Sequence, residues 1–198
     1  MKIDWNYPEP RTGLLGSWDR FIGPGATRGE ELLMLIPALL AGIAVPLYAI
    51  YANLNWNLLQ FVVASLMALD LVGGVVANAS SATKRWYHRE GQGFKDHFLF
   101  TAIHIIYPFL VAWLFLSMDW VFFIVVTSYL LVSAVIILKT PLYFQRPLAL
   151  LIFLGVLVLN IYILNSPVGL EWFVPVLFLK LIVAHLIREE PYRPDKEA

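Results

Sequence analysis

Cysteine is absent from the 198 residues of the chain. Its absence excludes disulfide bonds, thiolate metal ligands and a cysteine nucleophile, and it leaves the redox compartment open. Charged residues are also scarce, because Asp, Glu, Lys and Arg make up only 14% of the sequence, whereas soluble domains carry about 25%. Together with a hydrophobic content of 60%, this scarcity of charge indicates a membrane protein.

Three patterns that would assign a function are also missing. The first thirty residues contain no continuous apolar core, so we expect no cleaved signal peptide. The two halves of the chain share no inverted or parallel repeat, which argues against the repeat-built transporter folds. The four histidines form no His-x-x-x-His or His-x-x-His-His cluster, which argues against the membrane desaturases and hydroxylases.

Long apolar runs are the dominant positive feature. A transmembrane helix takes roughly 20 apolar residues, and six stretches approach that length. They cover residues 31–52, 57–79, 97–117, 120–139, 147–165 and 170–187. We therefore predict an all-α, polytopic integral membrane protein with six transmembrane helices in one bundle. In this division, residues 1–30 form an N-terminal segment, 31–187 the transmembrane domain and 188–198 a tail.

The N-terminal segment contains apolar residues at helical spacing. These are Leu14, Leu15, Trp18, Phe21 and Ile22. The spacing predicts a short amphipathic helix in the membrane interface. The alternative is a segment that packs over the ends of the bundle.

Basic residues give the predicted orientation. Thirteen of the fourteen Lys and Arg residues fall on one side of the predicted spans, and Lys180 is the only one inside a span. By the positive-inside rule, both termini and the basic loop 80–96 are then cytoplasmic. Trp56, Trp120 and Trp172 lie at the opposite turns, as an aromatic belt would.

Asp70, His104 and Lys180 form a predicted deep polar layer. Asp70 lies about ten residues, or roughly 15 Å, before the cytoplasmic end of its helix. A carboxylate at that depth is costly and faces the bundle interior, so we expect it to face the third or sixth helix. Gly73 or Gly74 should then lie at a close helix contact. Asp70 and His104 are the candidate catalytic acid–base pair, and Lys180 is a candidate ligand-binding residue. The alternative is an Asp70–Lys180 ion pair that only fixes helix packing.

Asn78, His97 and His185 form a predicted shallow layer, which His88 from the basic loop can approach. In an α-helix, Lys180 and His185 are about 140° apart and therefore point to different faces. His97 and His185 are candidate ligands of a divalent metal such as zinc or iron. A haem held by this histidine pair is the less favoured cofactor.

The basic loop supplies further candidates for ligand binding. Arg85, His88 and Arg89 lie among aromatic side chains, and with Asn78 they would suit an anionic headgroup or phosphate. Ordinary positive-inside charge is the alternative explanation.

The sequence thus predicts one cavity that is open to the cytoplasm. Asp70, His97, His104 and His185 would line it, with Arg85 or Arg89 at its mouth. We expect it to handle a lipid or another amphiphilic or anionic small molecule, and a membrane-embedded enzyme is one form of this hypothesis. The alternatives are a small proton-coupled transporter and an accessory subunit whose polar residues only fix packing. Membrane lipids are the expected partners, a homo-oligomer is compatible with the sequence, and no nucleic-acid partner is expected.

Overall fold

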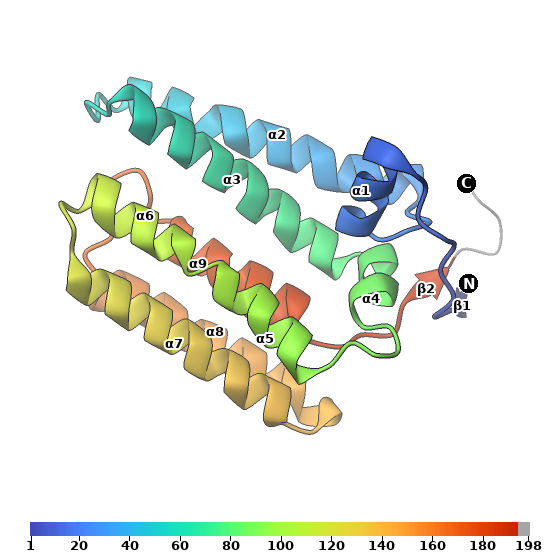
Figure 1. Cartoon of the computed structure of the whole chain (residues 1–198). Coiled ribbons are helices and arrows are strands. Elements are labelled where there is room, and N and C mark those ends of the chain that lie inside the picture. Colours follow the sequence, from blue (N-terminus) through green and yellow to red (C-terminus); the bar gives the residue numbers. More distant parts are fainter. Residues whose placement is uncertain (194–198) are drawn as a thin grey trace.

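Helices make up nearly all of the secondary structure in the computed structural model, which describes residues 1–193. In chain order the elements are β1 (Lys2–Ile3), α1 (Gly13–Ile22), α2 (Arg28–Tyr51), α3 (Leu58–Ala79), α4 (Ser81–Tyr87), α5 (Phe94–Ile103), α6 (Ile106–Phe115), α7 (Trp120–Lys139), α8 (Leu142–Tyr162), α9 (Phe173–Phe178), the π-helix η1 (Leu179–His185) and β2 (Tyr192–Arg193) (Figure 1). The predicted all-α class is confirmed. Lys196 of the predicted tail lies outside the described residues.

Within residues 1–193, five apolar helices are long enough to cross a membrane, which makes the chain a multi-pass membrane protein. They are α2, α3, α5 joined to α6, α7 and α8. The sixth apolar stretch is shorter, with 6 residues in α9 and 7 in η1, whereas a spanning helix takes roughly 20. The count of six spans is therefore not confirmed. Helix α8 also begins at Leu142, several residues before the predicted start of its span.

The segment formed by α9 and η1 lies in the middle of the bundle. It packs against α3 on one side and against α8 and α7 on the other. Most of its side chains are buried, including Phe173, Leu177, Leu181 and Ile182. Helix α2 packs on α3 at the outer edge of the bundle (Figure 1). The shortest of the apolar segments is thus the central one, and its neighbours cover it.

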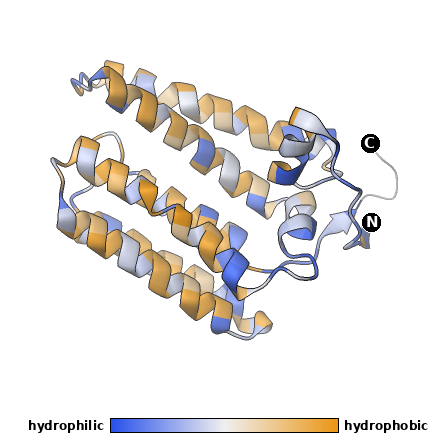
Figure 2. Cartoon of the chain, viewed as in Figure 1, coloured by the Kyte–Doolittle hydropathy of each residue, from blue (hydrophilic) through white to orange (hydrophobic). Residues whose placement is uncertain are grey.

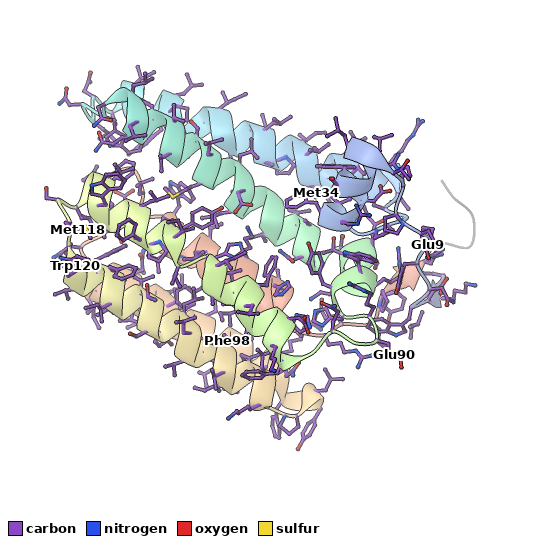
Figure 3. The ribbon with its side chains drawn as sticks, in the orientation of Figure 1. Glu9, Met34, Glu90, Phe98, Met118 and Trp120 are labelled. Carbon is purple, nitrogen blue, oxygen red and sulfur yellow. The ribbon has the colours of Figure 1, made fainter. Side chains whose placement is uncertain are left out.

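The two ends of the described chain meet at one end of the bundle. Strand β1 pairs antiparallel with β2, and Lys2 lies opposite Arg193. Helices α1 and α4 lie at this same end (Figure 1), which we call the polar end because hydrophilic segments gather there (Figure 2). Glu9 and Glu90 lie at the polar end, whereas Met118 and Trp120 lie at the opposite one (Figure 3). After α8, the segment α9–η1 therefore returns the chain to the polar end.

Local sequence signals explain where the helices begin and break. Capping boxes formed by Thr27 with Glu30 and by Asn57 with Gln60 begin α2 and α3. Pro108 has no N–H to donate to the carbonyl of His104, four residues earlier. The Tyr107 N–H donates to that carbonyl instead, at 3.0 Å. The chain is therefore interrupted between α5 and α6, directly after His104.

Two glycines of α3 allow close contacts, as the sequence predicted. A Cβ atom added to Gly73 would lie 2.9 Å from the Cβ of Ala38 on α2. A Cβ atom added to Gly74 would overlap the side chain of Lys180 on η1. Small residues of this kind let membrane helices approach each other closely. Helix α3 is thus held tightly between α2 and η1.

A helix, α1, forms where the sequence predicted a short N-terminal helix. Leu14 is 91% exposed, whereas Ile22 is buried. Arg11 pairs with Asp19 at 2.6 Å, and its guanidinium lowers the pKa of the Asp19 carboxyl below its usual value. The position of α1 in the membrane interface stays a prediction.

Candidate functional site

The π-helical geometry of η1 decides which polar groups meet. A π-helix bonds each N–H to the carbonyl five residues earlier, and the Leu186 N–H donates to the Leu181 carbonyl at 3.1 Å. Residues five apart therefore lie on nearly the same face. Lys180 and His185 both point toward α3 for this reason. The expectation that they face different directions is wrong, because it assumed α-helical rotation.

The deep layer is built around the carboxylate of Asp70. Lys180 Nζ donates to Asp70 Oδ2 at 2.5 Å, and the Tyr107 hydroxyl donates to the same oxygen at 2.8 Å. The Lys180 side chain is 4% exposed and that of Asp70 27%. Asp70 therefore points into the bundle toward α6 and η1, as predicted. Tyr107 was missed, although a tyrosine within a span needs a partner for its hydroxyl.

His104 lies beside this cluster without joining its hydrogen bonds. Its Nδ1 bonds to the Phe100 carbonyl at 2.6 Å, so Nδ1 carries the proton. The ring contacts that of Tyr107, with centroids 5.7 Å apart. Within residues 1–193, no direct hydrogen bond joins His104 to Asp70 or Lys180. The two candidate catalytic groups thus lie in one layer, and their acid–base role stays a prediction.

The shallow layer is a chain of three side chains from three helices. Asn78 Nδ2 donates to the Gly74 carbonyl at 2.8 Å, and Asn78 Oδ1 lies 3.0 Å from His185 Nδ1. His185 Nε2 lies 3.2 Å from His97 Nδ1. The ring of Phe100 stacks on that of His185 with centroids 3.9 Å apart. Phe100 thus covers the ring that links α3 to α5.

The predicted basic loop 80–96 begins with the helix α4, and two cations of this helix, Lys84 and Arg85, are buried. Lys84 Nζ donates to the carbonyls of Ala184 and Ile187, and His88 Nε2 donates to that of His185 at 2.9 Å. Ala184 and His185 lie in the last turn of η1 and Ile187 lies just beyond it, so Lys84 and His88 cap the end of the π-helix. Burial lowers the pKa of Lys84 to about 8. Burial, followed by the nearby charges, lowers the pKa of His88 to about 3.

Arg85 and Arg89 point in different directions. Arg85 is 2% exposed, and its guanidinium lies 3.4 Å from the Tyr192 carbonyl of β2. Arg89 instead lies over the ring of Trp86, 3.9 Å from its centroid. Of the two arginines expected at the mouth of a cavity, only Arg89 is there.

A cavity of about 640 Å³ opens at the polar end. Its polar walls include His88, Arg89, His97 and Arg188. Trp5 and Tyr7 of the N-terminal segment and Phe94, Leu138 and Leu186 of the bundle also border it. Asp70, His104 and His185 do not line it, so the expectation of one cavity shared by all four candidates is wrong. Packing is the reason, because Phe100 covers His185 and Lys180 fills the space beside Gly74.

A metal or haem does not fit the histidine pair as arranged. His97 and His185 turn ring nitrogens toward each other at 3.2 Å, which leaves no room for a porphyrin between them. The other nitrogen of His185 is taken by Asn78. Within residues 1–193, no three His, Asp or Glu side chains are placed to hold one metal ion. The roles predicted for His97 and His185 as metal ligands therefore find no support in the geometry.

Comparisons of the chain with protein-family models, with curated proteins and with solved structures find no match. The geometry of the two polar layers and the cavity is therefore the basis for inferring a function.

Removing the charge of Asp70 should destabilise the fold. In Asp70→Asn the Lys180 ammonium stays buried without its counter-ion, which costs about 3–5 kcal/mol. Adding Lys180→Met removes that ammonium and should restore most of the stability. The measurement is unfolding of the purified protein in mixed micelles, with the exposed Glu9→Gln as the matched control. An Asp70→Asn variant as stable as Glu9→Gln would contradict this account of the ion pair.

Proposed function

We propose that the protein binds an anionic amphiphile, with the anionic group in the cavity at the polar end. The observation that carries this proposal is a pair of arginines on the cavity wall. Arg89 lies over Trp86, and Arg188 lies 4.7 Å from the ring centroid of Trp5. Within residues 1–193, neither guanidinium forms an ion pair with a carboxylate. Both can therefore donate to a phosphate or carboxylate.

The electrostatic surroundings of the cavity favour an anion. Burial is the main cause of the low pKa of His88, and the charges of Lys84 and Arg188 lower that pKa further. Glu90 is the acidic side chain on the cavity wall, and it is exposed to solvent. The two arginines on the wall outnumber this exposed carboxylate, whose charge water screens.

The shape and chemistry of the cavity favour an amphiphile over a simple ion. Its volume falls within the range of roughly 300–1,000 Å³ that is typical of small-molecule sites. Phe94, Leu138 and Leu186 add apolar surface to its lining. An aliphatic chain can pack on that surface while its anionic group contacts Arg89 and Arg188. A lipid headgroup and a soluble phosphate share this chemistry, and the attached chain distinguishes them.

The cavity then lies at the level of the lipid headgroups. We propose that α9–η1 crosses the membrane as a sixth span and that both termini are cytoplasmic. Pairing of β1 with β2 supports this topology, because it joins the two ends of the described chain. The predicted basic asymmetry supports the cytoplasmic side. A short central helix can cross because its neighbours, rather than lipid, surround most of it.

The hydrogen bonds favour binding over proton transport. Within the described residues, no direct hydrogen bond joins the Asp70 layer to the chain of Asn78, His185 and His97. A proton crossing the membrane needs a continuous path through such groups. The internal pairing of Asp70 with Lys180 instead favours a packing role for the deep layer.

Hexyl phosphate should bind the detergent-solubilised protein in a saturable manner, as followed by calorimetry. Arg89→Gln and Arg188→Gln should each weaken binding about tenfold, because one hydrogen bond to a charged group contributes about 1.5–3 kcal/mol. Lys95→Gln is the matched control, since Lys95 is exposed on α5 and does not line the cavity.

Inorganic phosphate and hexanol separate the contributions to binding. Weaker binding of both than of hexyl phosphate supports an amphiphile, whereas equal binding of inorganic phosphate identifies a soluble anion. No saturable binding of hexyl phosphate to the wild-type protein, or an equal loss in Lys95→Gln, would contradict the proposal.

The topology is testable because the native chain has no cysteine. Single-cysteine variants at the exposed residues Glu9, Val168 and Glu190 report the two ends of the bundle and the segment between α8 and α9. Six spans predict that an impermeant maleimide labels only Val168→Cys in intact cells. Labelling of Glu9→Cys and Glu190→Cys should require permeabilisation. Labelling of Val168→Cys and Glu190→Cys from the same side would rule out the sixth crossing.

A further inference from the structure

We propose that Asn78 and His185 orient His97 so that its unprotonated Nε2 faces the cavity and accepts a proton from the bound anion. This inference rests on the proposed function, and it adds a chemical step to that site. The step transfers one proton from a P–OH or similarly acidic hydroxyl of the ligand to Nε2. The O–H bond breaks, an N–H bond forms, and the ligand gains one negative charge beside Arg89 and Arg188.

The protonation pattern of the chain follows from its first hydrogen bond. The Gly74 carbonyl can only accept, so the Asn78 amide must turn its NH₂ toward it. Asn78 Oδ1 then faces His185 Nδ1, which must carry a proton to donate. A neutral His185 consequently has a bare Nε2. One backbone carbonyl of α3 thus fixes the tautomer of a histidine on η1.

The same logic continues to the cavity. Because His185 Nε2 is bare, His97 Nδ1 must donate to it, and a neutral His97 then has a bare Nε2. Within residues 1–193 that atom has no hydrogen-bond partner and is not among the fully buried polar atoms. His97 lines the cavity. The lone pair of Nε2 is therefore open to a ligand there.

The surroundings keep His185 neutral. Its side chain is 2% exposed and stacks on Phe100. The titratable groups that act most on it are basic: Lys84, His88, His97 and His104. A second proton on His185 would bury a positive charge near the Lys84 ammonium, with no carboxylate hydrogen-bonded to the ring, which is unfavourable. The tautomer that presents Nε2 of His97 is thus the stable one.

Of the two rings hydrogen-bonded in series with Asn78, only that of His97 lines the cavity and can take up a proton there. The groups that face it are His185 from η1, Lys84 and His88 from the α4 region and Asp96 beside it on α5. After protonation, the bond from Nδ1 to His185 Nε2 becomes charge-assisted and stronger. Asn78 ends the chain, because an amide does not accept a proton. The hydrogen-bonded series of His97, His185 and Asn78 therefore holds a proton and does not conduct it onward.

Nitrogen-15 NMR of the four histidines tests this arrangement. The test is made near pH 6, where about half of an alkyl phosphate still carries its P–OH proton because its second pKa is about 6. In the ligand-free protein at this pH we expect protonated Nδ1 and bare Nε2 in both His97 and His185. Saturating hexyl phosphate should protonate Nε2 of His97 and leave His104 unchanged. Asn78→Asp places a carboxylate against His185 Nδ1. It should raise the pH midpoint at which the hydrogen-bonded pair of His185 and His97 takes up a proton by about one unit or more, because a nearby carboxylate favours the charged form.

Asn160→Asp is the matched control. Asn160 Nδ2 donates to the Glu171 carbonyl, and Asn160 takes no part in the hydrogen bonds of Asn78, His185 and His97. Asn78→Leu should mix the two tautomers of His185 and reduce ligand-induced protonation of His97. If it does not fold, Asn78→Asp still tests the coupling. A protonated Nε2 on His97 in the free protein, or an unchanged pH midpoint in Asn78→Asp, would overturn the proposed proton acceptance by His97. Binding without protonation of His97 would overturn it and leave the proposed function standing, whereas no binding would overturn both.

Discussion

The hydrogen-bonded seam between α3 and the π-helix η1 holds the rest of the structure in place. Gly74 leaves room for the Lys180 side chain, which passes over this glycine and reaches Asp70 one turn away on α3. A short distance toward the polar end, Asn78 on the same face of α3 bonds to His185. Both contacts exist together because η1 is wound so that residues five apart share a face. In an α-helix, Lys180 and His185 would point to different faces, so only one of them would face α3.

The end of η1 explains why so many basic groups gather at one place. A helix that stops inside a bundle leaves carbonyls without partners. Lys84 of α4 and His88, which directly follows α4, donate to carbonyls at this end. Positive charge at the C-terminal end of a helix is also favourable. The same capping places His88 on the wall of the cavity, beside His97. A structural requirement of the fold thus helps to give that end of the molecule its positive field.

The sequence predicted the features that depend on local pattern and on the cost of burial. Apolar run length gave the long helices, and the cost of an acid in lipid correctly placed Asp70 inside the bundle. The winding of η1 was missed because apolar composition does not distinguish an α-helix from a π-helix. Burial of Lys84 was missed because a basic loop is ordinarily assumed to lie in water. Arg188 and Trp5 meet only because β1 pairs with β2 across almost the whole chain, a contact that no local pattern reveals.

The central claim is that Lys180 and His185 contact α3 at the same time. Solid-state NMR of the protein in lipid bilayers can measure it through two nitrogen–carbon distances, from Lys180 Nζ to the Asp70 carboxyl carbon and from His185 Nδ1 to the Asn78 amide carbon. The structure predicts that both distances in one sample are those of directly hydrogen-bonded groups. A short distance for one pair with a long distance for the other would show α-helical winding and contradict the account.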